Sequence, residues 1–539
     1  MTDRQVTLGS GRTAGKWLMA MVFSIGICGP IMAAPNGPPT PSLKLSTMLS
    51  NNMMLQRGMR DPVWGWAKPG EHVEVQFGGQ RRSTEAGASG RWQVRLAPMP
   101  ADSKPRTLRI SGGGTHIQLT NVVVGEVWLV SGQSNMQYPM AGWFHRTNLA
   151  GELAAANHPG IRFYHVPMAP SMFAGRPHLT APAAWQVCTP KTAAGSSAVG
   201  YLFCNALHKR LGVPIGMIEA DWGGTSIEAW IPAQGYLSAD HLPREKRWLQ
   251  KSLAAEALLH GRPAQGKTAG LINSPHGYRY HFRSAWKPDA RQNPTTLFNG
   301  MISPLIPYAI RGAVWYQGEN NVLAFDRHYY PKLKALITSW RSMWKEGSFP
   351  FFIVQIAPFN YGVSWCGPHK SDAPYEPLVW QAEEKAAADL PDCGIIGTMD
   401  IGDLHNIHPA DKHDVGKRLA LSAMAQVYGK RIPAYASPMF QSAKFHGRSV
   451  LIRFSHCPGG LTTGNGAPPT WFFLADAKGP YKPAQARLHG QTVVLTAAGI
   501  LHPARIRFAW CCVAQPNLEN LKKLPALPFR FKRNRSGVN

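Results

Sequence analysis

The chain has 539 residues, of which 44% are hydrophobic, with 57 lysines and arginines against 30 aspartates and glutamates. The length predicts about three domains, and the apolar fraction excludes a globally disordered protein. A formal net charge of +27 is compatible with nucleic-acid binding. The basic residues are scattered, however, apart from the C-terminal stretch PFRFKRNRSGVN, so we expect no nucleic-acid partner.

Residues 1–34 have the pattern of a secretory signal peptide. Arg12 and Lys16 precede the apolar stretch WLMAMVFSIGICG, and the small residues of PIMAAP follow it. An apolar run of about 13 residues is typical of a cleaved signal, whereas a membrane span needs about 20. We therefore predict a secreted or periplasmic protein with no stable membrane insertion after cleavage. An uncleaved N-terminal anchor and a buried helix are the alternatives.

Two regions predict small β-domains. Residues 35–119 contain short alternating runs such as HVEVQFGG and RWQVRLAP, separated by the turn-forming segments KPGE and GASG. Residues 436–533 repeat this pattern in SVLIRFS, TWFFLAD and QARLHGQTVVLTA. Such spacing indicates an N-terminal β-sandwich and a second, C-terminal β-domain.

Residues 120–435 predict an α/β domain. Apolar strand-like runs, among them VVVGEVWLV, PIGMIEADW, GAVWYQ and FFIVQIAP, alternate with helix-like stretches such as SSAVGYLFCNALHKRLG. Continuously apolar strands that alternate with helices indicate a parallel sheet covered by helices. A polar stretch at about 234–293 interrupts the alternation and is interpreted as an insertion or lid. In such a sheet the site lies beyond the carboxyl ends of the strands.

A serine stands where the strand-like run VWLV ends. In GEVWLVSGQSNMQYPM, Ser134 follows Gly132 and Gln133 and precedes Asn135. A nucleophilic serine needs a base, a group that orients the base, and oxyanion donors. The GxSxG elbow of α/β-hydrolases is absent because Met136 takes its last position. We predict that Ser134 is a nucleophile at the start of a helix and that Asn135 supports the turn.

Two further loops supply candidate oxyanion donors. Gly223 and Gly224 follow the run PIGMIEA in DWGGTSIEAW, where either glycine can present its N–H to a ligand. Gln317 follows GAVWY in WYQGENN, with Glu319 and Asn320 as candidate supports of that loop. With the N–H of the serine, these groups predict a three-donor oxyanion hole. Taken alone, the double glycine would fit an ordinary tight turn equally well.

The segment DIGDLHNIHPADKHDVGKRLA supplies the candidate base. His408 precedes Pro409 just before a helix-like run, and Asp403 or Asp400 is close enough in sequence to orient its ring. The same residues, with His405, are also the types that bind metals. Because the segment accompanies a strand-end serine and two donor loops, we interpret His408 as a general base and predict no metal and no other cofactor.

These blocks resemble those of a known family. GQSNM, WGGT with IEAW, WYQGEN, and IHPADK with VGKRLA are similar to the blocks of the sialate O-acetylesterase branch of the SGNH/GDSL hydrolase superfamily. MMLQRG, LFNGMISPL and LPALPFR match the same branch, so the resemblance covers nearly the whole mature chain. It implies a flavodoxin-like α/β hydrolase domain with a parallel sheet, flanked by small β-sandwich domains. It also implies hydrolysis of acetyl esters on sugars, without a metal.

The resemblance also assigns roles by position. The nucleophile would be Ser134, the general base His408, and the oxyanion donors Gly223 or Gly224 together with Gln317. The superfamily often has an aspartate three residues before the histidine, where this chain has His405. Asp403 is the nearest replacement and our expected third member of a triad. Asp400, or a Ser–His dyad oriented by a backbone carbonyl, are the alternatives.

We therefore predict a secreted serine esterase that removes O-acetyl groups from carbohydrates, with an O-acetylated sugar or glycan as its partner. A sialate O-acetylesterase is the leading expectation, and acetyl groups on xylan, other hemicelluloses or pectin are the alternative substrates. Trp222, Trp230 and Trp315, which lie near the motifs, are candidates for stacking on a sugar ring. A non-catalytic glycan-binding protein and a polyanion-binding surface protein are the alternatives from other classes.

Overall fold

The computed structural model describes residues 43–143, 148–171, 179, 181–239, 241–243, 246–247, 249, 291–362 and 375–533. The predicted signal peptide, and most of the insertion predicted at about 234–293, lie outside the described residues. The described residues belong to one compact unit. Among the described residues, no helix has both the length and the apolar character needed to cross a membrane.

The first strands form two small antiparallel arrangements. One is the sheet β1-β3-β6, and in the other β4 pairs with β5 and with β7. Their bounds are β1 (Lys44–Leu45), β3 (Pro62–Trp66), β4 (His72–Phe77), β5 (Gln80–Glu85), β6 (Arg91–Arg95) and β7 (Asp102–Gly112). Strand β2 (Met54–Gln56) belongs to neither arrangement and pairs in parallel with residues 123–125. In β4 the buried Val73, Val75 and Phe77 alternate with more exposed residues, as expected for a strand with one face on the core.

Strand β8 (Thr115–Gly132) joins this region to the central sheet. Its first half pairs with β7 in antiparallel fashion and alternates in burial, whereas every residue from Val122 to Gly132 is buried. The second half pairs in parallel with strands on both sides, so helices cover both of its faces. The domain boundary predicted between residues 119 and 120 therefore falls within a continuous strand.

The central sheet has the strand order β10-β9-β11-β8-β12-β13-β14. All neighbours are parallel except β10, which pairs with β9 in antiparallel fashion. The bounds are β9 (His158–His165), β10 (Gln186–Cys188), β11 (Ile215–Asp221), β12 (Gly312–Tyr316), β13 (Phe351–Val354) and β14 (Cys393–Ile396). The predicted α/β class, with a largely parallel sheet and additional β-sheets, is confirmed.

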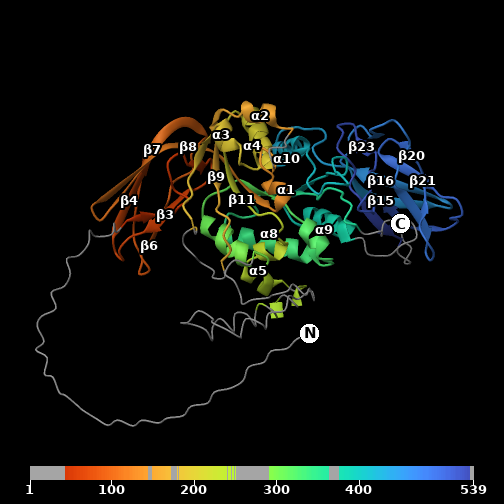
Figure 1. Cartoon of the computed structure of the whole chain (residues 1–539), viewed down its shortest axis with the longest axis horizontal. Coiled ribbons are helices and arrows are strands. Elements are labelled where there is room, and N and C mark those ends of the chain that lie inside the picture. The colour runs from red at the N-terminus through yellow and green to blue at the C-terminus, as the bar shows by residue number, and fades with distance from the viewer. Residues whose placement is uncertain are drawn as a thin grey trace, which may run out of the picture. The chain divides into compact units, whose positions relative to one another are not determined.

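Helices cover both faces of this sheet. In Figure 1, α4 (Ala198–Leu211) and α10 (Lys412–Gln426) lie above the strands, and α8 (Tyr329–Trp344) and α9 (Tyr375–Asp389) lie below them. The Ser197 hydroxyl caps α4 by accepting a hydrogen bond from the N–H of Gly200, and Gly212 ends the helix with a φ of 65°. The shorter helices are α1 (Ser134–Gln137), α2 (Ala150–Ala154), α3 (Pro190–Ala193), α5 (Ala233–Ser238), α7 (Glu319–Leu323), η2 (Ile227–Trp230), η4 (Phe298–Ile302) and η5 (Ser303–Leu305).

The C-terminal region forms antiparallel sheets with the orders β15-β16-β21-β20, β17-β23 and β19-β18-β22-β24. An aromatic cluster of Phe440, Phe454, Phe508 and Phe529 joins the first and the last of these sheets, with contacting ring centres between 4.4 and 6.3 Å apart. The bounds are β15 (Met439–His446), β16 (Ser449–Ser455), β17 (Leu461–Thr463), β18 (Phe472–Asp476), β19 (Lys482–Pro483), β20 (Gln485–His489), β21 (Thr492–Thr496), β22 (Pro503–Phe508), β23 (Leu518–Asn520) and β24 (Phe529–Lys532).

Candidate active site

Strand register brings three predicted loops to one edge of the sheet. In the parallel ladders, Gly132 at the end of β8 is level with Asp221 at the end of β11 and with Tyr316 at the end of β12. The residues that follow each strand therefore emerge at the same place. As a result Ser134 and Gly223 are neighbours. A side chain at Gly223 would place its Cβ only 3.2 Å from the Ser134 Cβ.

The turn before the nucleophile requires glycine at position 132. Gly132 has a φ of 144°, and a side chain there would clash with the carbonyl of Tyr316 on the neighbouring strand. Gln133 then fixes the turn, because its N–H donates to the Tyr316 carbonyl oxygen at 3.0 Å. Its side-chain Oε1 accepts from the N–H groups of Gly318 and Asn320, at 3.4 and 3.2 Å. The loop after β12 thus holds the turn that presents the serine.

Ser134 and His408 form a hydrogen-bonded pair. The Ser134 Oγ lies 2.9 Å from the His408 Nε2, although the two residues are 274 positions apart in sequence. The Nε2 of Gln133 also approaches the same hydroxyl at 3.4 Å. A serine hydroxyl within hydrogen-bonding distance of a histidine nitrogen, at the carboxyl end of a central strand, is the geometry of a nucleophile and its base.

Asn135 ties the histidine loop to the nucleophile. Its Nδ2 donates to the carbonyl oxygen of Ile407, the residue before His408, at 2.9 Å, and to the Glu319 Oε1 at 2.6 Å. Its Oδ1 accepts from the Lys412 Nζ at 2.6 Å. The residue beside the nucleophile is therefore a link between three elements, and the prediction that Asn135 and Glu319 support the site agrees with these contacts.

Lys412 is a buried cation that the sequence did not identify as part of the site. Its exposed fraction is 0%, and its ammonium lies over the rings of Tyr138 and Tyr316, 5.1 and 5.7 Å from their centres. Burial lowers the pKa of Lys412 to about 7, against the opposing attraction of Glu319 and Asp411. The lysine is the first residue of α10 and follows His408 by four positions, across a non-helical loop that contains Pro409.

The environment keeps His408 neutral. Burial, and then the positive charge of Lys412, lower the pKa of His408 to about 4. The ring also meets the ring of Trp143 in an edge-to-face contact, with centres 4.5 Å apart. A neutral imidazole is the form that accepts a proton from a serine, so the base is in its active form well below neutral pH.

The structure does not bring either candidate aspartate to the His408 ring. The Asp403 carboxylate is exposed, and its Oδ1 accepts the N–H of His405 at 2.8 Å. The Asp400 carboxylate makes a two-pronged pair with the buried Arg418, at 2.8 and 2.6 Å. Among the hydrogen bonds of the described residues, none joins a carboxylate to His408, so this geometry favours the dyad over both aspartates.

Gln317 lies in the site but its amide is already engaged. The side chain is fully buried, and its Nε2 donates to the Gln133 Oε1, the Thr225 carbonyl and the Asn321 Oδ1, at 3.2, 3.0 and 2.8 Å. Its Oε1 accepts the Tyr329 hydroxyl at 2.8 Å. In this arrangement Gln317 links the loops after three strands, and it does not present a donor to an oxyanion.

The glycine loop supplies one N–H beside the nucleophile. The Gly223 N–H donates to the Gln137 Oε1 at 2.8 Å. Gly224 has a φ of 68° and forms the turn. Asn320, also predicted in the site, donates through its Nδ2 to the Ser226 Oγ. The Ser134 N–H, in the first turn of α1, has no partner within that helix. The backbone donors that the two loops offer at the nucleophile are therefore the N–H groups of Ser134 and Gly223, beside the Gln133 Nε2 at 3.4 Å from the hydroxyl.

Two of the three tryptophans expected to stack on a sugar belong to the core. Trp230 and Trp315 have exposed fractions of 0%, and their rings meet edge to face with centres 6.0 Å apart. The Trp315 ring also packs on Trp340. The expectation was wrong for both, because strand and helix interiors use tryptophan as bulk. Trp222 is partly exposed, and Arg291 lies over its ring at 5.9 Å.

Comparisons with known proteins agree with this geometry. The profile of a family described as carbohydrate esterase, sialic acid-specific acetylesterase, matches residues 255–425. Sialate O-acetylesterases of Rattus norvegicus and Homo sapiens are 27% and 26% identical to this chain. The two alignments each cover 77% of it, and 79% and 76% of the relatives. The crystal structure of a carbohydrate acetylesterase from Xanthomonas citri is 31% identical, with a TM-score of 0.76, and the match covers 91% of this chain and 99% of that one.

The chain belongs to the carbohydrate acetylesterase family. The prediction of a carboxylic ester hydrolase that acts on O-acetylated carbohydrates is therefore confirmed. The comparisons favour it over the two alternatives, a non-catalytic glycan-binding protein and a polyanion-binding surface protein.

Replacing Lys412 by methionine is expected to lower the stability of the acetylesterase. It is also expected to shift the acidic limb of the pH–activity profile upward, so that activity begins to fall at a higher pH during acidification. Methionine keeps the apolar stem but removes the charge that lowers the pKa of His408. The buried Asn135 Oδ1 also loses its donor, which costs about 1–3 kcal/mol. We expect the acidic limb of the kcat/KM profile for an aryl acetate to move to higher pH, and the Tm to fall. Lys417→Met, an exposed position on the same helix, is the control, and equal profiles for the two variants would contradict the assignment.

Chelation of metals is expected to leave the acetylesterase active. Among the described residues, no group of three or more histidines, cysteines, aspartates or glutamates is placed to hold a metal ion. In the predicted rival cluster, Asp400 pairs with Arg418 and Asp403 accepts a backbone N–H. We expect equal rates of aryl acetate hydrolysis before and after dialysis against EDTA. A loss that added zinc restores would favour the metal interpretation.

Proposed function

We propose that this acetylesterase removes O-acetyl groups from sialic acids outside the cytoplasm, with Ser134 and His408 acting as a dyad. The observation that carries the proposal is the 2.9 Å hydrogen bond between the Ser134 Oγ and the His408 Nε2 at the carboxyl end of β8. A hydroxyl paired with a neutral imidazole can attack an acyl carbon. A protein that only binds sugars has no need of such a pair.

The steps follow from these positions. The Ser134 Oγ attacks the acetyl carbonyl carbon while the His408 Nε2 accepts the hydroxyl proton. The N–H groups of Ser134 and Gly223 stabilise the negative oxygen of the tetrahedral intermediate, once the ester oxygen replaces the Gln137 Oε1 at Gly223. The imidazolium then gives its proton to the departing sugar hydroxyl. Water, deprotonated by His408, attacks the acetyl-serine, and the imidazolium returns this proton to the Ser134 Oγ as acetate leaves.

The arrangement of the sheet supports placement in the SGNH superfamily. The five central strands run β11-β8-β12-β13-β14, which is the order 2-1-3-4-5 when they are numbered from β8 along the chain, leaving out β9 and β10. This is the order of flavodoxin-like sheets, whose sites lie at the carboxyl ends where the strand order reverses. Ser134 follows β8, the strand from which the order reverses.

The substrate is proposed from the relatives. The rat and human relatives are named sialate O-acetylesterases, and the matching profile is described as sialic acid-specific. We expect acetate release from 9-O-acetyl-N-acetylneuraminic acid to have a higher kcat/KM than release from acetyl xylan or acetylated pectin. A preference for xylan or pectin would contradict the sialate assignment and leave the esterase assignment intact.

The dyad predicts that neither aspartate is needed for chemistry. Asp403→Asn is expected to keep turnover close to wild type, because the asparagine Oδ1 can still accept the His405 N–H. Asp400→Asn is expected to lower the Tm more than kcat, because it weakens the pair with buried Arg418. A fall in kcat of about a hundredfold for Asp403→Asn would restore the triad, since such a change costs about 10⁴-fold where the aspartate orients the histidine.

The location outside the cytoplasm rests on the pattern of residues 1–34 alone. Cell fractionation of the expressed full-length chain, with mass spectrometry of its N-terminus, tests it. A mature protein that begins near residue 35 and appears outside the cytoplasm supports the proposal. An uncleaved chain in the cytoplasm would contradict it.

A further inference from the structure

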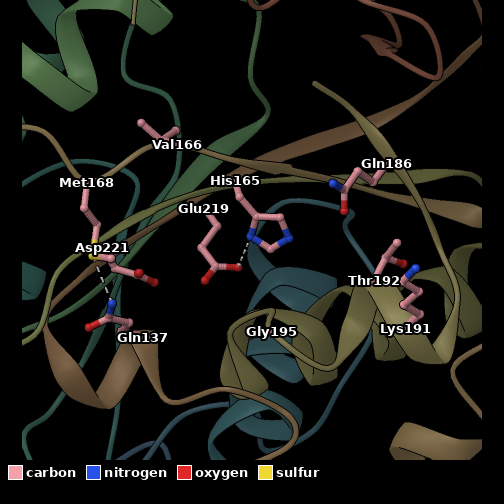
Figure 2. A pocket seen from close by; sticks show the side chains of 10 residues that line it. All are labelled: Gln137, His165, Val166, Met168, Gln186, Lys191, Thr192, Gly195, Glu219 and Asp221. Atoms are coloured by element: carbon pink, nitrogen blue, oxygen red, sulfur yellow. Dashed lines mark hydrogen bonds and ion pairs between the residues drawn. The ribbon is translucent and has the colours of Figure 1, made fainter. Parts of the chain in front are cut away.

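A cavity of about 480 Å³ lies at the carboxyl ends of β9 and β11, and Gln137 of the short helix that Ser134 begins forms part of its lining. Figure 2 shows the side chains that surround it, with Gln137 and Asp221 on one side and Gln186, Lys191 and Thr192 across from them. Its volume is in the range of small-molecule sites. Val166 and Met168 add an apolar wall, so the cavity offers both hydrogen-bonding groups and a surface for C–H groups.

One carboxyl group in this cavity has an oxygen without a partner. Asp221 is only 5% exposed, and among the described residues its Oδ2 has no hydrogen-bond partner. Burial, and then the neighbouring Glu219, raise the pKa of Asp221 well above its usual range, which favours a neutral carboxyl that can both donate and accept. A buried polar atom without a partner is costly, so a group from outside the chain is expected to complete it.

Two neighbours of Asp221 in the cavity, Glu219 and His165, are already held by hydrogen bonds. The Glu219 Oε2 accepts the Ser197 N–H at 2.9 Å and lies 3.3 Å from the His165 Nδ1. Burial opposes the charge of His165, but the attraction of Glu219 and its hydrogen bond together raise the pKa of that ring. The His165 Nε2 lies 3.4 Å from the Ser196 Oγ. Glu219 and His165 therefore hold each other in place, whereas the Asp221 Oδ2 has no partner among the described residues.

The cavity communicates with the nucleophile through Gln137. This residue ends the short helix that Ser134 begins, and its side chain lines the cavity. Its Oε1 accepts the N–H of Gly223, the residue that touches Ser134, and Asp221 lies two positions before that glycine. We therefore expect a molecule whose acetyl group lies at Ser134 to extend past Gln137 toward Asp221.

We infer that this cavity is the subsite for the sugar that carries the acetyl ester, and that Asp221 and Lys191 bind its hydroxyl groups. The inference rests on the proposed function, and it names the part of the substrate that the site recognises. Neighbouring hydroxyls of a sugar each donate and accept, which matches a carboxyl group, an ammonium and amides facing one another. The apolar wall of Val166 and Met168 matches the C–H face of the same sugar.

The test compares esters with and without a sugar. kcat and KM are measured for 9-O-acetyl-N-acetylneuraminic acid, for an acetylated xylo-oligosaccharide and for an aryl acetate, in wild type, Asp221→Leu and Lys191→Ala. We expect KM for at least one sugar ester to rise about tenfold more than KM for the aryl acetate, as expected for one lost hydrogen bond to the ligand. Inhibition of aryl acetate hydrolysis by free N-acetylneuraminic acid, or by the deacetylated xylo-oligosaccharide, should weaken to the same extent.

Two controls keep the outcomes apart. Lys191 is exposed, so its variant should fold even if Asp221→Leu does not, and Lys209→Ala removes an exposed lysine from α4 outside the cavity. Equal losses on sugar and aryl esters, or no loss in either cavity variant, would overturn the subsite. Wild-type protein that hydrolyses the aryl acetate but no sugar ester would instead overturn the proposed function. The inhibition measurement would then judge the subsite by itself.

Discussion

Replacing Ser134 by alanine is expected to abolish ester hydrolysis while the protein stays folded. Loss of the nucleophile in a serine hydrolase costs about 10⁶-fold in kcat, because the remaining donors stabilise an intermediate that no longer forms on the enzyme. The hydroxyl contacts only His408 and Gln133 among the described side chains, so its removal should cost about 1 kcal/mol of stability.

Aryl acetate hydrolysis and thermal unfolding of the same preparation provide the measurement. Ser449→Ala is a matched control, because that hydroxyl donates to the His446 carbonyl in a C-terminal hairpin outside the site. We expect it to keep both activity and Tm. A Ser134→Ala protein that retained more than a few per cent of wild-type turnover would contradict the role of this serine.

Much of the central fold could be predicted because periodicity and turn residues act locally. The helix-like run YYPKLKALITSWRSMW corresponds to α8 (Tyr329–Trp344), and a serine and a glycine mark the two ends of α4 (Ala198–Leu211). The extent of β8 was beyond such reasoning. The first half of β8 alternates in burial like a strand with one covered face, and the second half is buried on both faces. This change of pattern predicted a domain boundary at a point where the structure has one uninterrupted strand.

The sequence predicts which loops meet at the site, because the ends of the parallel strands determine where those loops emerge. Parallel register makes Gly132, Asp221 and Tyr316 level, and this alone places Ser134 beside the glycine loop. The partners of individual polar side chains depend on rotamers and on residues distant in sequence. Gln317 is engaged by acceptors from three loops, and Asp400 by Arg418 on a later helix. Neither contact follows from spacing, and the same holds for the buried position of Lys412.

Replacing His408 by glutamine is expected to reduce kcat by about 10⁴-fold or more, because no group would take the Ser134 proton. Glutamine can still hydrogen bond to the Ser134 hydroxyl, so the fold and the serine position should be kept. The amide has no basic form at accessible pH, and the residual activity should therefore lack the acidic limb of the wild type. A small loss, or an unchanged acidic limb, would assign the base elsewhere.

The wild-type profile carries its own prediction about that limb. His408 acts when neutral, and burial with the nearby Lys412 lowers its pKa to about 4, so kcat/KM should be full above that pH and decline as the pH falls through it. An ordinary histidine would lose activity from about 6.5 downward. The direction of the His408 pKa shift also distinguishes a dyad from a triad. In a triad, a carboxylate at the His408 Nδ1 would favour the imidazolium and raise the pKa of the ring. A limb near or above the ordinary value, with the protein still folded by circular dichroism, would therefore contradict the dyad and indicate a carboxylate partner.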